Sequence, residues 1–212
     1  MSDLLIGVLA LQGAFVEHED ALAPLGVTTR QIRTVAEMEG IDGLVIPGGE
    51  STTIGLIGGD SGLLDAIRDA VGAGLPVFGT CAGMIMLARA TTGGRQPLVG
   101  GLDIVVTRNA FGRQVASFEA DVAMPSVGED PFPGVFIRAP WIEEHGLDVE
   151  ILAEVRGHPV AARHGSMLVT AFHPELTEDR RVHRLFVDMV RGDGTGSQAK
   201  PTVGGGIRVR PQ

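Results

Sequence analysis

The sequence predicts an α/β protein in three layers, in which a mainly parallel central sheet is flanked by helices and carries a small antiparallel extension. Three observations lead to this fold class. Short apolar runs alternate with segments of helical periodicity in the first half of the chain, small turn-forming residues follow the apolar runs, and closely spaced strand-like runs take over after residue 98. Strand–helix alternation favours a parallel sheet, whereas hairpin-like spacing favours antiparallel pairing.

The first half of the chain supplies this alternation. The runs at 4–9, 43–46 and 76–80 are apolar throughout, as in strands buried on both faces, and 28–32 is expected to form a further strand. Helical segments end at Gly26 and near Gly72, with a short helical turn at 34–38 and a helix after the glycine pair at 48–49. The helix that ends at Gly26 has its inward face at Phe15, His18, Ala21, Leu22 and Leu25. The helix that ends near Gly72 has its inward face at Leu63, Leu64, Ile67, Ala70 and Val71.

The second half is richer in strands. Strand-like runs are expected at 102–106, 118–122, 134–137, 149–155, 159–163 and 167–172, and we assign them to the antiparallel extension. A last amphipathic helix at 180–190 has its inward face at Val182, Leu185, Phe186, Met189 and Val190. We expect residues 1–191 to form one domain and the glycine-rich residues 192–212, which contain almost nothing to bury, to form a flexible tail.

Composition narrows the class of partner. The formal net charge of −9 argues against nucleic acid or an anionic membrane surface as the main partner, because both require a basic footprint. The apolar run near the N-terminus is far shorter than the roughly 20 residues that span a bilayer. A single cysteine forms no internal disulfide and no basic leader is visible, so we expect a reducing, cytoplasmic location.

The only cysteine lies in a sharp turn between a buried strand and a helix. Gly79 and Gly83 flank Cys81 two residues away on either side, which allows a strained bend and a close approach of strand and helix. A helix N-terminus favours the thiolate, the reactive form of the side chain, and the amide of Ala82 would point to the reacting centre. A lone cysteine is otherwise often a small buried hydrophobe, but the two glycines and the apolar run favour a nucleophile.

A second glycine pair follows another central strand. Gly48 and Gly49 allow the main chain to approach a ligand with its N–H groups turned toward it, which makes Gly49 a candidate oxyanion or substrate contact. For the hydroxyls of Ser51 and Thr52, N-capping of the next helix is the favoured role.

His173 and Glu175 form the third candidate element of the site. His173 follows an apolar strand, and the carboxylate two residues later is able to orient the imidazole as the base that a cysteine nucleophile needs. The other five histidines lack such a setting, and no spacing predicts a metal site.

Two arginines stand at the ends of strand-like runs. Arg108 is able to hold a carboxylate through two parallel hydrogen bonds, and a surface ion pair with one of the 26 acidic residues is the open alternative. Arg138 occupies a similar position after the run at 134–137.

Taken together, these motifs resemble the class I (triad) glutamine amidotransferases, which have a flavodoxin-like three-layer fold, and in more detail the glutaminase subunits of pyridoxal phosphate synthase. The matching segments run from residue 11 to residue 179 and leave the tail uncovered. They are Leu11–Gly13, Pro47–Thr52, Gly79–Gly83, Arg108–Gln114, Phe136–Pro140 and Phe172–Asp179.

The resemblance implies a role for each matched residue. Cys81 would be the nucleophile, His173 the general base and acid, and Glu175 the residue that orients it. The amides of Gly49 and Ala82 would form an oxyanion hole. The residues implied to hold L-glutamine are Gly49, Glu50, Ser51, Arg108, Ile137 and Arg138. No cofactor or metal is implied.

The resemblance also implies a partner. Ammonia released from glutamine would pass to a synthase subunit, a (β/α)₈ barrel, whose docking near Gln12 orders the Gly48–Gly49 peptide. Two alternatives remain at this stage: the glutaminase subunit of another enzyme such as imidazole glycerol phosphate synthase, and a binding protein with a relic site. The intact Cys81, His173 and Glu175 argue against the second, and the 79–83 and 108–114 segments against the first.

Overall fold

The structure is a computed structural model and describes residues 4–111 and 117–192. Apart from Gly192, the predicted tail lies outside the described residues, as do residues 112–114 of the fourth matched segment. No helix in the described ranges is long and apolar enough to span a membrane.

A central sheet organises the molecule. Within the described residues it has seven strands, in the order β10 (Glu150–Val155), β11 (His158–His164), β12 (Met167–Thr170), β4 (Val77–Thr80), β3 (Gly43–Ile46), β1 (Leu5–Leu9) and β2 (Thr28–Ile32). The run from β12 to β2 is parallel, and β10 and β11 continue it as antiparallel strands. The predicted fold class is confirmed, but the strand at 167–170 belongs to the parallel sheet and not to the extension.

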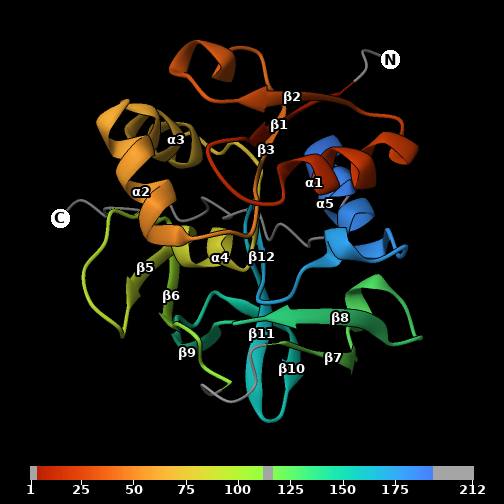
Figure 1. Cartoon of the computed structure of the whole chain (residues 1–212). Coiled ribbons are helices and arrows are strands. Elements are labelled where there is room, and N and C mark those ends of the chain that lie inside the picture. Colours follow the sequence, from red (N-terminus) through yellow and green to blue (C-terminus); the bar gives the residue numbers. More distant parts are fainter. Residues whose placement is uncertain (1–3, 112–116, 193–212) are drawn as a thin grey trace, which may run out of the picture.

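Helices cover both faces of this sheet. Figure 1 shows the sheet on edge, with α1 (Phe15–Leu22) and α5 (Arg181–Arg191) on one side and α2 (Ser51–Asp60), α3 (Leu63–Gly72) and α4 (Ala82–Leu87) on the other. The 3₁₀ helices are η1 (Ala23–Leu25), η2 (Val35–Met38), η3 (Pro125–Val127) and η4 (Pro174–Leu176). Sheet and helices together give the three predicted layers.

Two small sheets complete the fold, beside the lower part of the central sheet in Figure 1. One consists of β5 (Ala88–Thr91), β6 (Leu102–Thr107) and β9 (Trp141–His145), and the other of β7 (Ser117–Val122) and β8 (Phe132–Ile137). The sequence did not predict β5 or β9, which are short and carry charged residues. The pairs β6–β9 and β7–β8 are antiparallel, whereas β5 pairs with β6 in parallel.

The core lies between the sheet and its two helical layers. Phe78 on β4 packs against Phe186 on α5, with ring centroids 5.7 Å apart, and both side chains are fully buried. Burial of each such side chain contributes about 1.5–3 kcal/mol. The inward face of α5 differs from the predicted one, because His183 and Val187 are fully buried whereas Leu185, Met189 and Val190 are only partly so.

The parallel strands end at one edge of the sheet, and the candidate residues follow those ends. Gln12 comes after β1, the Gly48–Gly49 pair after β3, Cys81 after β4 and His173 after β12. Parallel strands place their carboxyl ends together, so the sheet collects these four segments in one place.

Candidate active site

Cys81 occupies a strained elbow between β4 and α4. Its φ of 47° lies in the left-handed region, which is unusual for a residue with a side chain. The Cys81 N–H donates a 2.8 Å hydrogen bond to the carbonyl of Thr170 on the neighbouring strand, and this bond fixes the bend. The thiol is buried but lines the pocket, 3.9 Å from the carbonyl oxygen of Ile137.

The two glycines around Cys81 are required by close packing. A Cβ on Gly83 would lie 2.0 Å from the carbonyl oxygen of Ile46, and one on Gly79 would lie 2.6 Å from the carbonyl carbon of Gly83. Both contacts are to backbone atoms, which have little freedom to move. The predicted reason for these glycines is thereby confirmed.

His173 and Glu175 form a buried pair beside the thiol. Their Nδ1 and Oε1 atoms are 2.7 Å apart, and His173 and Glu175 are only 7% and 5% exposed. Burial lowers the pKa of His173, but its interactions with Cys81 and Glu175 outweigh this effect and raise the pKa to about 10. Burial likewise opposes the charge of Glu175, whose pKa is nevertheless held low by His18 and His173. The charged imidazolium and carboxylate stabilise each other.

The Gly48–Gly49 peptide is held by the loop after β1. The carbonyl of Gly48 accepts a hydrogen bond from the N–H of Ala14 at 3.2 Å, so the N–H of Gly49 in the same trans peptide points the other way. Gln12 Oε1 accepts the N–H of Glu50 at 2.6 Å. A Cβ on Gly48 would lie 2.3 Å from Cε1 of His173, which explains a glycine at that position.

Glu50 and Arg108 form the polar end of the site. Glu50 Oε1 is 3.0 Å from Arg108 Nη2, so the ion pair left open by the sequence exists, and it lies in the pocket. Burial raises the pKa of Glu50, but amide and hydroxyl donors from Thr53 and Thr52 bring the pKa below its ordinary value. Glu50 is therefore the N-cap of α2, and the cap predicted at Ser51 or Thr52 is wrong.

The Ser51 and Thr52 hydroxyls instead face a glutamine that the sequence did not single out. Gln96 Oε1 lies 3.2 Å from Ser51 Oγ, 3.3 Å from Thr52 Oγ1 and 3.0 Å from Arg108 Nη1. Gln96 thus holds the guanidinium of Arg108 in place. No local pattern reveals it, because it lies in a turn-rich loop 12 residues before its partner.

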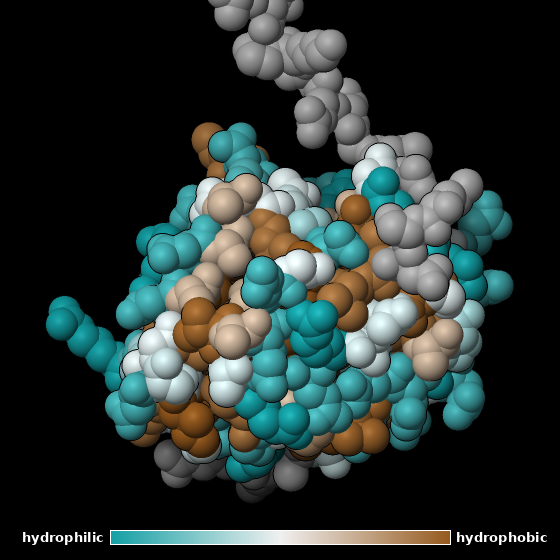
Figure 2. All heavy atoms as spheres, turned by 90° about the horizontal axis from the view of Figure 1, so that it is seen from above, coloured by the Kyte–Doolittle hydropathy of each residue, from teal (hydrophilic) through white to brown (hydrophobic). Residues whose placement is uncertain are grey.

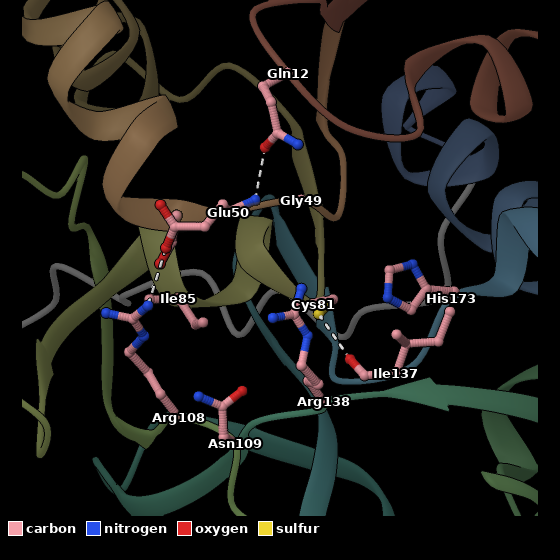
Figure 3. A pocket seen from close by; sticks show the side chains of 11 residues that line it. Gln12, Gly49, Glu50, Cys81, Ile85, Arg108, Asn109, Ile137, Arg138 and His173 are labelled. Carbon is pink, nitrogen blue, oxygen red and sulfur yellow. Dashed lines mark hydrogen bonds and ion pairs between the residues drawn. The ribbon is translucent and has the colours of Figure 1, made fainter. Parts of the chain in front are cut away.

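These residues surround a cavity of about 240 Å³, which Figure 3 shows from close by. Cys81 and His173 lie at one side of it, with Arg108 and Glu50 at the other, and Arg138 comes up from the end of β8. The lining residues are Gln12, Gly49, Glu50, Ser51, Cys81, Ile85, Arg108, Asn109, Ile137, Arg138 and His173. Glu175 stands behind His173, and Ala82 is the buried first residue of α4.

The structure adds residues to those that the sequence predicted. Ile85 and Asn109 line the cavity, and His18, which seemed to lack a functional setting, lies 3.4 Å from Glu175 through its Nε2 atom. In the sequence, the one indication of a role for Asn109 is that it directly follows Arg108. Within residues 4–111 and 117–192, no three His, Cys, Asp or Glu side chains are grouped so as to hold a metal ion.

Comparison with known proteins places the chain in a family. The model of the SNO glutamine amidotransferase family matches residues 8–192. The chain is 59% identical over 198 residues to the pyridoxal 5'-phosphate synthase subunit PdxT of Frankia casuarinae, covering 92% of this chain and 100% of that protein. It is 56% identical over 185 residues to the PdxT of Carboxydothermus hydrogenoformans, covering 87% and 97% of the two chains.

Solved structures agree with this assignment. A crystal structure of a glutamine amidotransferase superposes with a TM-score of 0.84 at 48% identity, covering 88% of this chain and 98% of that one. A glutamine amidotransferase from Thermotoga maritima has a TM-score of 0.59 at 14% identity, covering 91% and 86%, and shows the shared fold alone. The chain belongs to the SNO glutamine amidotransferase family.

Proposed function

We propose that this protein is the glutaminase subunit of a pyridoxal 5'-phosphate synthase, that it hydrolyses L-glutamine to L-glutamate and ammonia, and that Cys81, His173 and Glu175 form its catalytic triad. The observation that carries the proposal is the strained Cys81 elbow in the same pocket as the buried His173–Glu175 pair. The relatives named as PdxT support the assignment to vitamin B6 biosynthesis.

The pocket suits glutamine at both ends. A free amino acid carries an ammonium and a carboxylate, and Glu50 and Arg108 offer one charge of each kind. Bound glutamine would exchange the Glu50–Arg108 ion pair for contacts to these two groups. Gly49, Ser51, Ile137 and Arg138 line the rest of the cavity, so that the side-chain amide reaches toward Cys81.

The reaction proceeds in two stages. The Cys81 thiolate attacks the amide carbon, the oxyanion is stabilised by the amides of Gly49 and Ala82, and the imidazolium of His173 donates a proton to the leaving ammonia. The product of this stage is a glutamyl thioester. His173, now neutral, takes a proton from water, which attacks the thioester, and glutamate leaves as the thiol is restored.

Ammonia needs a protected route, since water would protonate it and disperse it. We propose that a synthase subunit built as a (β/α)₈ barrel receives the ammonia directly, and that the pair acts in the cytoplasm, where a lone thiol stays reduced. We place the docking face over α1 and α2; Figure 2 shows one face of the protein, on which hydrophobic patches lie among hydrophilic ones. Val16 on α1 and Leu56 and Ile57 on α2 are large apolar side chains that are 48%, 55% and 43% exposed.

This face is well placed to control the site. The loop that precedes α1 carries Gln12 and Ala14, which bond the N–H of Glu50 and the carbonyl of Gly48, so a displacement of α1 is transmitted through these two hydrogen bonds to the backbone on either side of Gly49. We therefore expect low glutaminase activity without the partner.

The test measures glutamate formed from L-glutamine by the purified protein, alone and mixed with the synthase subunit from the same source. We expect weak turnover alone and a strong rise on mixing. Cys81→Ala should abolish ammonia release and retain partner binding, whereas unchanged turnover in this variant would refute the triad. No turnover by the wild type under either condition would refute the glutaminase function itself.

A further inference from the structure

Two buried histidines lie behind the proposed triad. His18 on α1 and His183 on α5 are fully buried, and their Nδ1 and Nε2 atoms are 3.0 Å apart. These helices pack side by side on one face of the sheet in Figure 1. His18 Nε2 is 3.1 Å from the hydroxyl of Thr80, the last residue of β4, which is also fully buried. Polar side chains at such depth cost free energy unless they are hydrogen-bonded.

The buried group formed by His18, His183 and Thr80 lies next to Glu175 of the proposed triad. Glu175 uses Oε1 to bind His173, and its other oxygen, Oε2, lies 3.4 Å from His18 Nε2. Glu175 Oε2 is buried and makes no hydrogen bond of good geometry to the described residues. A buried carboxylate oxygen needs a donor nearby, and the only ring nitrogen of His18 that faces it is Nε2.

Thr80 connects the same buried group to Gly48. Thr80 Oγ1 accepts the N–H of Gly48 at 3.0 Å, and this contact is buried. His18 Nε2 therefore lies 3.4 Å from the carboxylate that orients His173, and it is two hydrogen bonds away from Gly48, the residue before the proposed oxyanion donor.

The hydrogen-bond pattern selects one tautomer of His18. His183 Nδ1 is buried without a partner among the described residues, so the proton of that ring belongs on Nε2 and is donated to His18 Nδ1. His18 then carries its own proton on Nε2, the atom that faces Glu175 and Thr80. Burial, the largest effect on each, lowers the pKa of His18 and lowers that of His183 well below its ordinary value, which agrees with two neutral rings.

We propose that His18 is a positioning residue for glutamine hydrolysis: its Nε2–H group holds the Glu175 carboxylate in the orientation that serves His173, and His183 fixes the tautomer that makes this possible. The proposal rests on the proposed function above. His18 does not line the substrate cavity, so it acts through Glu175 and Thr80 and not on glutamine itself. The groups that act on its charge are Glu17, His173 and Glu175, with Arg180 acting on the neighbouring His183.

The test compares His18→Gln with His18→Asn in the assembled complex. Both side chains carry an amide, but the longer Gln side chain places its nitrogen where Nε2 of histidine stood, whereas that of Asn stops at the position of Nδ1. We expect His18→Asn to lower kcat about tenfold to a hundredfold, the usual effect of losing a hydrogen bond to a charged group, with the glutamine KM unchanged within about twofold. His18→Gln should recover most of this loss.

A matched control is His164→Leu. His164 pairs with Met167 at the start of β12, and Met167 pairs with Val77 at the start of β4, so His164 lies at the opposite edge of the sheet from Cys81. Within the described part of the chain, its ring bonds only the carbonyl of Asp148. This variant should leave kcat and KM unchanged.

A second readout needs neither glutamine nor the partner. The rate of Cys81 alkylation by iodoacetamide is measured against pH for the wild type and the three variants. Weakened support of Glu175 destabilises the imidazolium of His173, so His18→Asn should move the pH midpoint upward by about half a unit or more, and His164→Leu should not.

The outcomes separate this proposal from the proposed function. Equal kcat values in His18→Gln and His18→Asn, whether high or low, would overturn it, as would an unchanged alkylation midpoint in His18→Asn. A purely structural role would lower the unfolding temperature of His18→Asn without moving that midpoint. If the wild-type complex forms no glutamate, the glutaminase function fails, and the alkylation profile still decides the role of His18.

Discussion

The charge on His173 makes stability at alkaline pH a direct probe of the site. A pKa raised from 6.5 to about 10 corresponds to about 5 kcal/mol of stabilisation of the folded state. Since the folded-state pKa is the higher one, this contribution is complete below pH 6.5 and is lost as the pH rises through about 10. Cys81 and Glu175 share it, because both stabilise the imidazolium.

Glu175→Gln measures how much of this stabilisation comes from the Glu175 carboxylate. The variant keeps the shape of the side chain and removes the charge that meets His173 Nδ1 at 2.7 Å. A hydrogen bond between charged groups contributes about 1.5–3 kcal/mol, so the wild type should lose about that much more stability than the variant between about pH 6 and about pH 10.5. Only the pH dependence of the two free energies of unfolding is compared. Their absolute values differ for a second reason, because the variant also removes the free-energy cost of burying a charge.

Composition makes this measurement unusually clean. The chain has no tyrosine and a single lysine, Lys200, so few other side chains titrate in the alkaline range. The free energy of unfolding in urea, measured at a series of pH values, is the readout. Glu178→Gln, which removes an exposed carboxylate three residues away, is the control and should follow the wild type. Parallel curves for the wild type and Glu175→Gln would refute the assignment of Glu175 as the partner of His173.

Further predictions concern substrate binding and packing. Arg108→Ala should raise the glutamine KM about tenfold or more with a small change in kcat, and Gln96→Leu should raise it less; an unaltered KM would remove either residue from the site. Gly83→Ala should destabilise the protein by more than about 2 kcal/mol, because its Cβ would meet the carbonyl of Ile46, whereas Gly59→Ala on the exposed side of α2 should stabilise it by up to about 1 kcal/mol. Urea unfolding measures both, and equal stabilities of the two variants would contradict the packing argument.

The sequence predicted the central parallel strands well because they are buried on both faces. The segments at 43–46 and 77–80 are buried at every position and have the bounds expected or differ by one residue, since apolar runs ended by turn residues leave little freedom of register. The strand at 28–32 also has the bounds expected, although it is a polar edge strand with one buried residue. The strand at 88–91 was missed because half of it is solvent-facing, with Arg89 exposed on it. The last helix shows the same limit, because periodicity alone did not reveal a buried His183.

The site was predictable where chemistry and backbone constraint coincide. Glycines around Cys81 and the His173–Glu175 spacing are local signals, and the structure accounts for each of them by a contact within a few residues or across one strand. Gln96 and His18 carry no such signal. Their partners stand 12 and 157 residues away, so only the folded chain brings them together.

The position of the residues proposed to bind glutamine gives the antiparallel extension a role in the site. The parallel sheet brings the thiol, the imidazole and the glycine pair to one edge, but of the charged side chains at the far end of the cavity only Glu50 follows one of its strands. Arg108 and Arg138 come from the ends of β6 and β8, and a 2.9 Å hydrogen bond from the Ala110 N–H to the Ala139 carbonyl joins the two segments. Asn109 and Arg138 have φ values of 48° and 43°, so both turns are held in strained conformations that aim neighbouring residues at the cavity. The extension therefore supplies the two arginines of the proposed site. The local sequence around Arg108 left the role of this residue open because its partners, Glu50 and Gln96, lie on other segments of the chain.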